Sequence, residues 1–163
     1  MSLLAWCEWL QHTRLATAIG ESNWLFPFVE GSHILTLPLA VGMVFMFDLR
    51  LLGLAFRGDS ARTMVKQLLR WSWIGFAITF LTGGLLFITQ ADKAYNNAFF
   101  RAKLILLVLL GINAVVYHRA FESKMTQWDS HARPPLGARF CGGLSLVFWI
   151  AVIFCGRTMA YQF

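Results

Sequence analysis

Residues Trp71 to Ala91 read WSWIGFAITFLTGGLLFITQA, 21 consecutive positions without a charged side chain. A helix needs about 20 mainly apolar residues to cross the hydrocarbon core of a bilayer, which is about 30 Å thick. This segment alone therefore predicts a transmembrane helix. Three further stretches of the chain meet the same requirement, and the predicted spans are residues 24–47, 71–91, 99–118 and 140–157.

The overall composition supports the same fold class. Hydrophobic residues make up 58 % of the 163 residues and charged residues only 13 %, against roughly 45–50 % and about 25 % in soluble domains. A soluble domain of this size would leave much of that apolar surface in water. No repeat or linker divides the chain. We therefore expect one all-α domain over residues 1–163, an integral membrane four-helix bundle.

The N-terminal segment, about residues 2–20, is expected to form an interfacial amphipathic helix. Trp6, Trp9 and several apolar residues recur at helical spacing, while Glu8 and Arg14 interrupt the apolar run. These charges and the lack of a basic start argue against a signal peptide. The alternative is a short helix packed over the bundle.

Basic residues predict the orientation of the spans. The first and third connections contain 9 Lys and Arg residues and the remaining segments contain 5, and basic loops stay on the cytoplasmic side. The expected localisation is a bacterial inner membrane, multi-pass, with both termini periplasmic. The net charge of +6 then needs no nucleic-acid partner.

The first span has the most informative polar residues, namely Glu30, His33 and Asp48. Ionisable groups inside a membrane are costly and indicate function. At 100° per residue, Glu30 and Asp48 share one azimuth and His33 lies about 60° from it. We expect one polar face, with His33 and Glu30 as candidate metal ligands.

Counting residues inward from the span ends places Gly83, Gly84 and Gly111 near the depth of His33. Glycines at this level allow either close helix packing or room for a flat macrocycle such as haem b. The candidate cofactor-binding residues are therefore His33, Gly83, Gly84 and Gly111. His118 ends the third span and is about 10–15 Å away in height, so it is a poor second ligand. His12 and His131 lie in polar contexts typical of surface histidines.

Glu30, one turn from His33, is expected to accept a proton from one imidazole nitrogen and leave the other nitrogen free. If the free nitrogen faces the glycines, it can ligate a haem iron or another metal. If it faces a backbone carbonyl or the Thr82 hydroxyl, His33 is a packing residue.

Other polar residues are expected to form a structural network. Lys103 has a depth similar to that of Glu30, which predicts an ion pair because an isolated buried charge is costly. The residues expected to organise the cytoplasmic end are Asp48, Arg50, Asn113 and His118.

Several short patterns resemble a known family. They are WLFPFVEGSH at 24–33, DLRLLG at 48–53, TGGLLF at 82–87, and Asn97-x-Phe-Phe-x-x-Lys103. Over about residues 1–120 the chain resembles small bacterial integral membrane proteins grouped as a domain of unknown function. The resemblance implies a four-span inner-membrane protein and makes Glu30, His33, Asp48, Arg50 and Lys103 recurrent polar positions. It implies no activity, and the fourth span matches nothing distinctive.

Three functions remain open at this stage. The first is a membrane redox subunit that holds a haem or another metal centre at His33 and passes electrons to a protein partner or quinone. The second is a non-catalytic anchor or assembly subunit of a larger complex or homo-oligomer. The third is a small proton-linked carrier using Glu30, His33 and Asp48. The sequence contains no GxSxG, P-loop, HExxH or CxxC motif, so no enzyme class is indicated.

Overall fold

The structure, a computed structural model, describes residues 3–129 and 134–161. The regular structure in these ranges is entirely helical, which confirms the all-α fold class. Four helical stretches are long and apolar enough to cross a membrane: Leu25–Leu52, Ala61–Thr89, Ala98–Ala120 and Leu136–Ala160. They extend beyond the expected spans because helices continue past the hydrocarbon core. The 29 residues of the second stretch are about 43 Å long.

The first of these stretches is built from α3 (Leu25–Leu37), the π-helix η1 (Pro38–Gly42) and α4 (Met43–Leu52). The other three are single helices, α5 (Ala61–Thr89), α7 (Ala98–Ala120) and α9 (Leu136–Ala160). The short elements are α1 (Leu3–Gln11), α2 (Arg14–Gly20), α6 (Ala91–Asn96), η2 (Glu122–Lys124) and α8 (Met125–Trp128).

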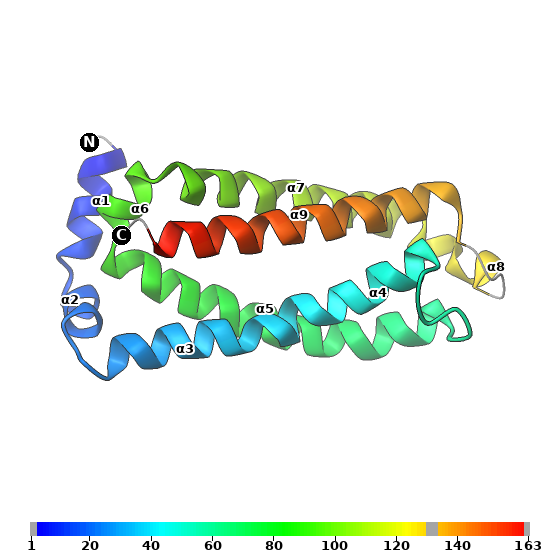
Figure 1. The fold of residues 1–163 in the computed structure, drawn as a ribbon, viewed down its shortest axis with the longest axis horizontal. Helices are drawn as coiled ribbons and strands as arrows, with labels where there is room; N and C mark the ends of the chain where they lie inside the picture. The colour runs from blue at the N-terminus through cyan, green and yellow to red at the C-terminus, as the bar shows by residue number, and fades with distance from the viewer. Residues whose placement is uncertain (1–2, 130–133, 162–163) are drawn as a thin grey trace.

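The long helices form two antiparallel pairs. Helix α3 packs along α5, and α7 packs along α9. Both chain ends lie at one end of the bundle, here called the terminal end, and α8 lies at the other, the α8 end (Figure 1). The pairs are joined toward the α8 end, where α4 packs on both α9 and α5. At the terminal end, α3 lies away from α9, while α5 rises toward α6, which connects it to α7 (Figure 1).

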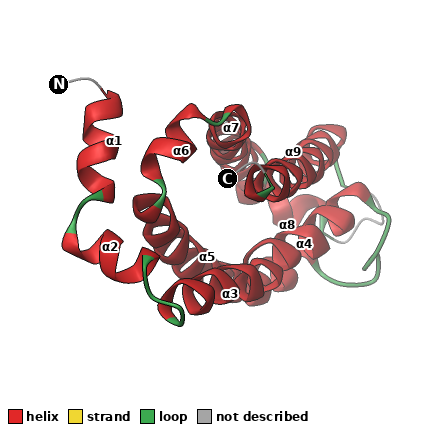
Figure 2. Ribbon diagram, turned by 60° about the vertical axis from the view of Figure 1, so that its left-hand side comes forward, coloured by secondary structure: helices red, strands yellow, loops and turns green. Residues whose placement is uncertain are grey.

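Two helices, rather than the expected single one over residues 2–20, precede the first span. The chain breaks at Thr13, whose side chain accepts a hydrogen bond from the Ala16 amide at 3.4 Å and caps α2. Helix α1 packs on α6 and α2 packs on α5 (Figure 2). Trp6 and Trp9 of α1 remain exposed. This segment thus covers the terminal end of the bundle while presenting two indole rings outward.

The first span contains a π-helix where Pro38 interrupts the hydrogen-bond ladder. Proline has no amide hydrogen and its ring crowds the preceding turn, and a π-turn accommodates one extra residue. One extra residue rotates the helix beyond it by about 100°. Accordingly Glu30 is exposed whereas Asp48 is buried. The prediction that these two acids share one face was wrong.

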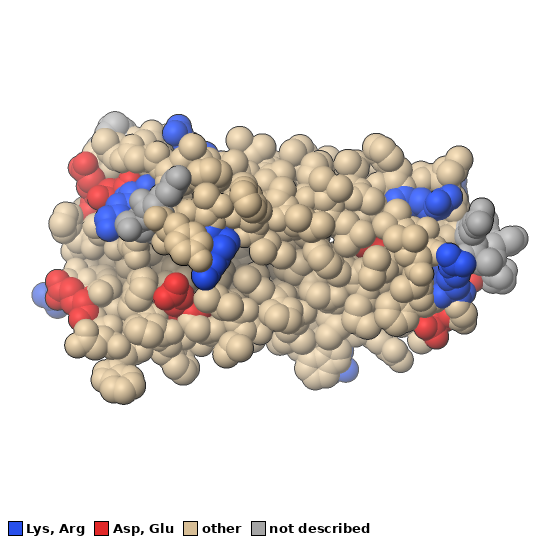
Figure 3. Space-filling view, viewed as in Figure 1, with Lys and Arg blue, Asp and Glu red and all other residues tan. Residues whose placement is uncertain are grey.

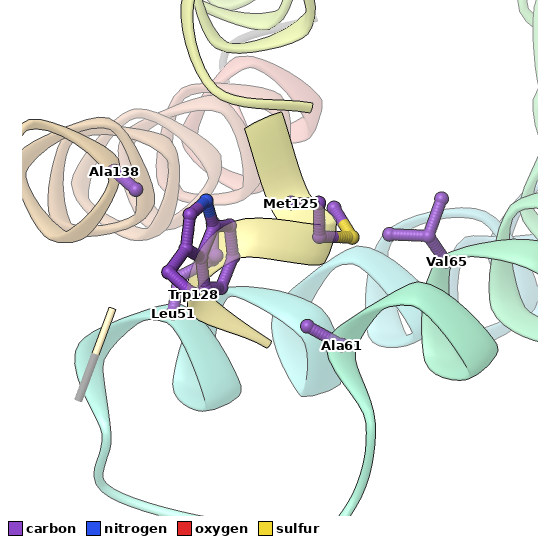
Figure 4. Packing of buried hydrophobic residues seen from close by; sticks show 6 residues of the cluster. All are labelled: Leu51, Ala61, Val65, Met125, Trp128 and Ala138. Atoms are coloured by element: carbon purple, nitrogen blue, oxygen red, sulfur yellow. The ribbon is translucent and has the colours of Figure 1, made fainter. Parts of the chain in front are cut away.

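Two hydrophobic clusters hold the bundle together. At the α8 end, side chains from α4, α5, α8 and α9 meet in a buried cluster (Figure 4), which consists of Leu51, Ala61, Val65, Met125, Trp128 and Ala138. In the middle, η1, α7 and α9 contribute a second cluster, in which the Phe76 ring of α5 stacks on Trp149. The core therefore lies in the middle and at the α8 end, and polar side chains occupy the terminal half between α3 and α5.

Candidate functional site

Polar side chains of the terminal half form the candidate site. Most charged side chains visible in Figure 3 gather near the two ends of the molecule, and acidic and basic side chains also border a hollow between the two helix pairs. His33 of α3 is the titratable residue that the structure ties most closely to its neighbours in this region. It is half-buried.

Thr82 of α5 fixes the imidazole of His33. The Nδ1 atom lies 3.0 Å from Oγ1 of Thr82, and that hydroxyl donates its hydrogen to the Ile78 carbonyl at 2.8 Å. While that hydrogen stays on the Ile78 carbonyl, the hydroxyl can only accept from His33, and Nδ1 is then the protonated nitrogen. Nε2 then has a free electron pair. No side-chain hydrogen bond of Nε2 occurs within the described ranges, and the backbone of Thr79 is a further hydrogen-bonding group at the ring.

A second side-chain contact between α3 and α5, this time between two hydroxyls, lies one turn further along these helices. Oγ1 of Thr36 is 3.0 Å from Oγ1 of Thr79, and Thr36 also bonds to the Ser32 carbonyl at 2.9 Å. The pairs 33–82 and 36–79 follow the three-residue spacing of one helix face in two antiparallel helices. Thr79 and Thr82, three residues apart in the second span, are the sequence signal for these two contacts.

Gly83 allows His33 to lie against α5. A Cβ at Gly83 would stand 3.0 Å from Cε1 and 3.5 Å from Nδ1 of His33, so the ring rests directly on the glycine. Gly84 and Gly111 are exposed, and a Cβ at either would have open space around it. Of the three glycines expected near His33, the structure brings only Gly83 into contact with it.

The expected ion pair between Glu30 and Lys103 is not formed. Within the described residues, Glu30 makes no hydrogen bond or ion pair, and the ion pair that does occur joins His118 to Glu122. The physical reason is that α3 packs on α5 while Lys103 belongs to α7, which packs on α9. The Nζ atom of Lys103 lies along α9, 3.7 Å from the place of a Cβ on Gly156.

Glu30 does not hold His33, and Nδ1 lies at the Thr82 hydroxyl instead, a contact expected above of a packing histidine. No group of three His, Cys, Asp or Glu side chains that could hold a metal occurs in the described part of the chain. A metal bound here would therefore depend on His33 and on ligands from outside such a cluster. His12 lines a pocket of about 520 Å³ beside Arg14 and Glu21, and His131 lies outside the described residues.

The expected network at the opposite end is divided among separate contacts. Nδ2 of Asn113 donates to the Cys141 carbonyl at 3.0 Å and so ties α7 to α9. Nε of Arg50 donates to the Asp59 carbonyl at 2.9 Å. His118 is 71 % exposed and bonds to Glu122 one turn away. Arg50, Asn113 and His118 thus bond to other groups and not to one another.

Asp129 was not singled out by the sequence, yet it joins α8 to α5. Its carboxylate accepts hydrogen bonds of 2.5 Å from the Ser60 hydroxyl and from the Ala61 amide. Partial burial alone would raise the pKa of Asp129, but these bonds and the nearby charge of Arg50 hold it below its ordinary value. No local sequence pattern connects residue 129 to residue 60, so only the fold reveals this contact.

Four apolar spanning helices, short connections and a histidine held between two of them define the chain as a small multi-pass helical membrane protein. It belongs to a family of unknown function, DUF6644, whose model matches residues 6–162. The match includes the fourth span, beyond the region of the resemblance noted from the sequence. No curated protein matches the chain, and no solved structure does.

Proposed function

We propose that this protein is a membrane redox subunit that holds a b-type haem or another metal centre through Nε2 of His33. The observation that carries the proposal is the hydrogen-bond chain from His33 to Thr82 to the Ile78 carbonyl. A histidine that donates through one nitrogen has its tautomer and ring orientation fixed, and its other nitrogen is ready to ligate. Electrons would pass to a protein partner or to a quinone.

The surroundings of His33 support a flat ligand between the two helix pairs. Gly83 lets the ring lie against α5, and Figure 3 shows a hollow between the two helix pairs. Lys103 acts electrostatically on His33 from the other pair, so its ammonium is a suitable partner for an anionic substituent such as a haem propionate. The second axial ligand would come from a thioether, from His12, from another protomer or from solvent.

The same proposal places the protein in a bacterial inner membrane with both termini in the periplasm. Its support is the excess of basic residues in the first and third connections, 9 against 5. The terminal end, and with it His33, would then face the periplasmic side. A periplasmic electron-transfer protein could approach that end directly.

The test is an absorption spectrum of the full chain purified in detergent from cells supplied with iron and a haem precursor. A Soret band with sharp bands in the reduced state is expected, and His33→Ala should abolish it while circular dichroism stays helical. His118→Ala is the control because His118 is 71 % exposed at the α8 end, bonds to Glu122, and is not a candidate ligand of the centre. A colourless, metal-free wild-type protein, or full pigment in His33→Ala, would contradict the proposal.

One observation favours the second candidate, a non-catalytic anchor or assembly subunit. The 33–82 and 36–79 contacts join α3 to α5 with side chains of this chain alone. In that case the space between the helix pairs would receive a transmembrane helix of a partner, and Glu30 and Lys103 would meet polar groups of that partner. A colourless protein that co-purifies with one partner in a fixed ratio, and loses it in Glu30→Gln or Lys103→Met, would support this candidate.

A further inference from the structure

A second polar site lies at the α8 end, separate from His33, and its central residue is Asp48. The side chain of Asp48 is only 3 % exposed, although the residue belongs to a spanning helix. Its Oδ2 atom is fully buried and has no hydrogen-bond partner among the described residues. The hydroxyl of Ser145 on α9, itself buried, is the side-chain group that interacts with the carboxyl.

Among the described residues no ion pair joins a cation to this carboxyl, although Nη1 of Arg50 and Nε of Arg139 on α9 are also fully buried without a partner. Arg50 lies on the same helix but donates through Nε to the Asp59 carbonyl and acts on Asp129. Lys66 and Arg70 of α5 are exposed, and no cation of α5 or α9 acts on Asp48. The titratable groups that interact with Asp48 from the neighbouring helices are Tyr117 of α7 and Cys141 of α9, and neither is a cation at neutral pH.

The hydroxyl of Tyr117 is also fully buried without a partner in the described part of the chain. An unpaired carboxylate in an apolar interior is costly, and such a group becomes neutral by taking up a proton. A neutral carboxyl carries its own donor, so Oδ2 no longer needs a cation and can bond to a small polar molecule such as water. Buried polar atoms without a partner call for a missing proton or water, and the described residues contain five, namely Asp48 Oδ2, Arg50 Nη1, Tyr117 Oη, Trp128 Nε1 and Arg139 Nε.

We propose that Asp48 is an intramembrane proton-binding site, which holds one proton in the closed bundle and releases it toward the α8 end. The position fits this role because Asp48 lies about one turn from Leu52, where α4 ends. Release leaves a carboxylate, which Ser145 stabilises by donating its hydroxyl hydrogen. Uptake and release of this proton move one positive charge between water and the edge of the membrane interior. The protonation of Asp48 therefore depends on the proton concentration on the α8 side.

Infrared spectroscopy of the full chain in lipid vesicles tests this site directly. A protonated carboxylic acid has a carbonyl band distinct from the bands of a carboxylate, and carbon-13 labelling of aspartate shifts only aspartate bands. The chain has four aspartates, Asp48, Asp59, Asp92 and Asp129. At neutral pH the labelled wild-type protein should show a protonated aspartate band, which Asp48→Asn removes and Asp59→Asn leaves unchanged.

The labelled wild-type spectrum keeps the proposal falsifiable even if Asp48→Asn fails to fold. Absence of a protonated aspartate band in wild type at neutral pH would overturn the proposal. An ionised aspartate band that shifts when sodium replaces potassium would assign the site to a metal cation and would also overturn it. Loss of the protonated band as the pH rises, with return on acidification, is the expected result for a proton that exchanges.

Discussion

The backbone of Ala40 lies so close to Gly75 that a Cβ on the glycine would stand 2.5 Å from the Ala40 amide nitrogen and 2.8 Å from its Cα. Real Cβ atoms do not approach backbone atoms so closely. Helix α5 and the π-helix of the first span thus cross with their backbones in direct contact. Small residues allow such crossings in membrane proteins, and this one fixes how α3 and α4 lie on α5.

Gly75→Ala should destabilise the bundle by about 1–3 kcal/mol, because the added methyl must displace backbone rather than a flexible side chain. The measurement is unfolding by heat or denaturing detergent, followed by circular dichroism. Gly84→Ala is the control, since a Cβ there meets nothing within 4 Å. A Gly75→Ala variant as stable as Gly84→Ala would mean that the helices do not cross at this point.

Ser72→Ala should cost about 1 kcal/mol, the usual net value of one hydrogen bond. The Ser72 hydroxyl is buried and donates to the Ala40 carbonyl at 2.7 Å, one turn from Gly75. Thr158→Ala provides the comparison, because the Thr158 hydroxyl is exposed and bonds only within its own helix. Equal unfolding midpoints for these two variants would contradict a stabilising contact between α5 and η1.

Thr82→Val should release the imidazole of His33, since valine keeps the shape of threonine and removes the hydroxyl that fixes Nδ1. Nitrogen-15 NMR of labelled histidine should change from a single Nδ1-protonated tautomer to a mixture, and stability should fall by about 1 kcal/mol. Thr89→Val is the matched control, because that hydroxyl bonds only to the Leu86 carbonyl. An unchanged tautomer in Thr82→Val would refute the assignment.

Glu30 and Lys103 should act independently in a double-mutant cycle. They form no ion pair, so the losses of Glu30→Gln and Lys103→Met should add within about 0.5 kcal/mol in the double variant. Unfolding in detergent measures all four proteins. A double variant that recovers part of the lost stability would show instead that Glu30 and Lys103 form the ion pair expected from the sequence.

The Asp129 contact should make stability depend on pH in acid. Hydrogen bonds from Ser60 and Ala61 and the charge of Arg50 lower the pKa of Asp129 in the folded protein below 3.8, its ordinary value. A lowered pKa contributes stability that is complete above the unfolded value and is lost as the pH falls through the folded value. Asp129→Asn should therefore be less stable than wild type at neutral pH, with the difference closing below about pH 4.

The measurement is the unfolding midpoint of both proteins over an acidic pH series. Asp59→Asn serves as the control, because its carboxylate is exposed and Arg50 bonds to its backbone carbonyl instead. A difference between wild type and Asp129→Asn that persists unchanged in strong acid would assign the effect to side-chain shape rather than to charge.

Hydropathy predicted the four spans because the need for about 20 apolar residues is a property of each segment alone. Counting residues from the span ends also predicted depth in the membrane, since it placed Gly83 near His33. The sequence did not predict which helices pack against each other, and for this reason Glu30 was paired with Lys103. Equal depth does not bring together two helices that each pack on another partner. The π-turn at Pro38 made the predicted direction of Asp48 around the helix axis incorrect. That prediction assumed 3.6 residues per turn throughout.

The candidate site was predictable in part for the same reasons. His33 was identified because an ionisable residue in an apolar span is conspicuous in the sequence. Its partner was harder to assign. Glu30 is nearer in the chain and its carboxylate is the stronger hydrogen-bond acceptor, but Thr82 lies on the helix that α3 packs against. The contact of Asp129 with Ser60 joins residues 69 positions apart, and nothing in either segment anticipates it.

The π-helix at Pro38–Gly42 also affects how related sequences must be aligned. A π-turn is what a helix becomes when one residue is inserted while both ends stay in place. A relative with a regular α-helix here would lack one residue, and a correct alignment would have a single gap between positions 38 and 42. An alignment without that gap would displace either the His33 half or the Asp48 half by one position. Each half therefore has its own register, and counterparts of the two residues must be sought separately.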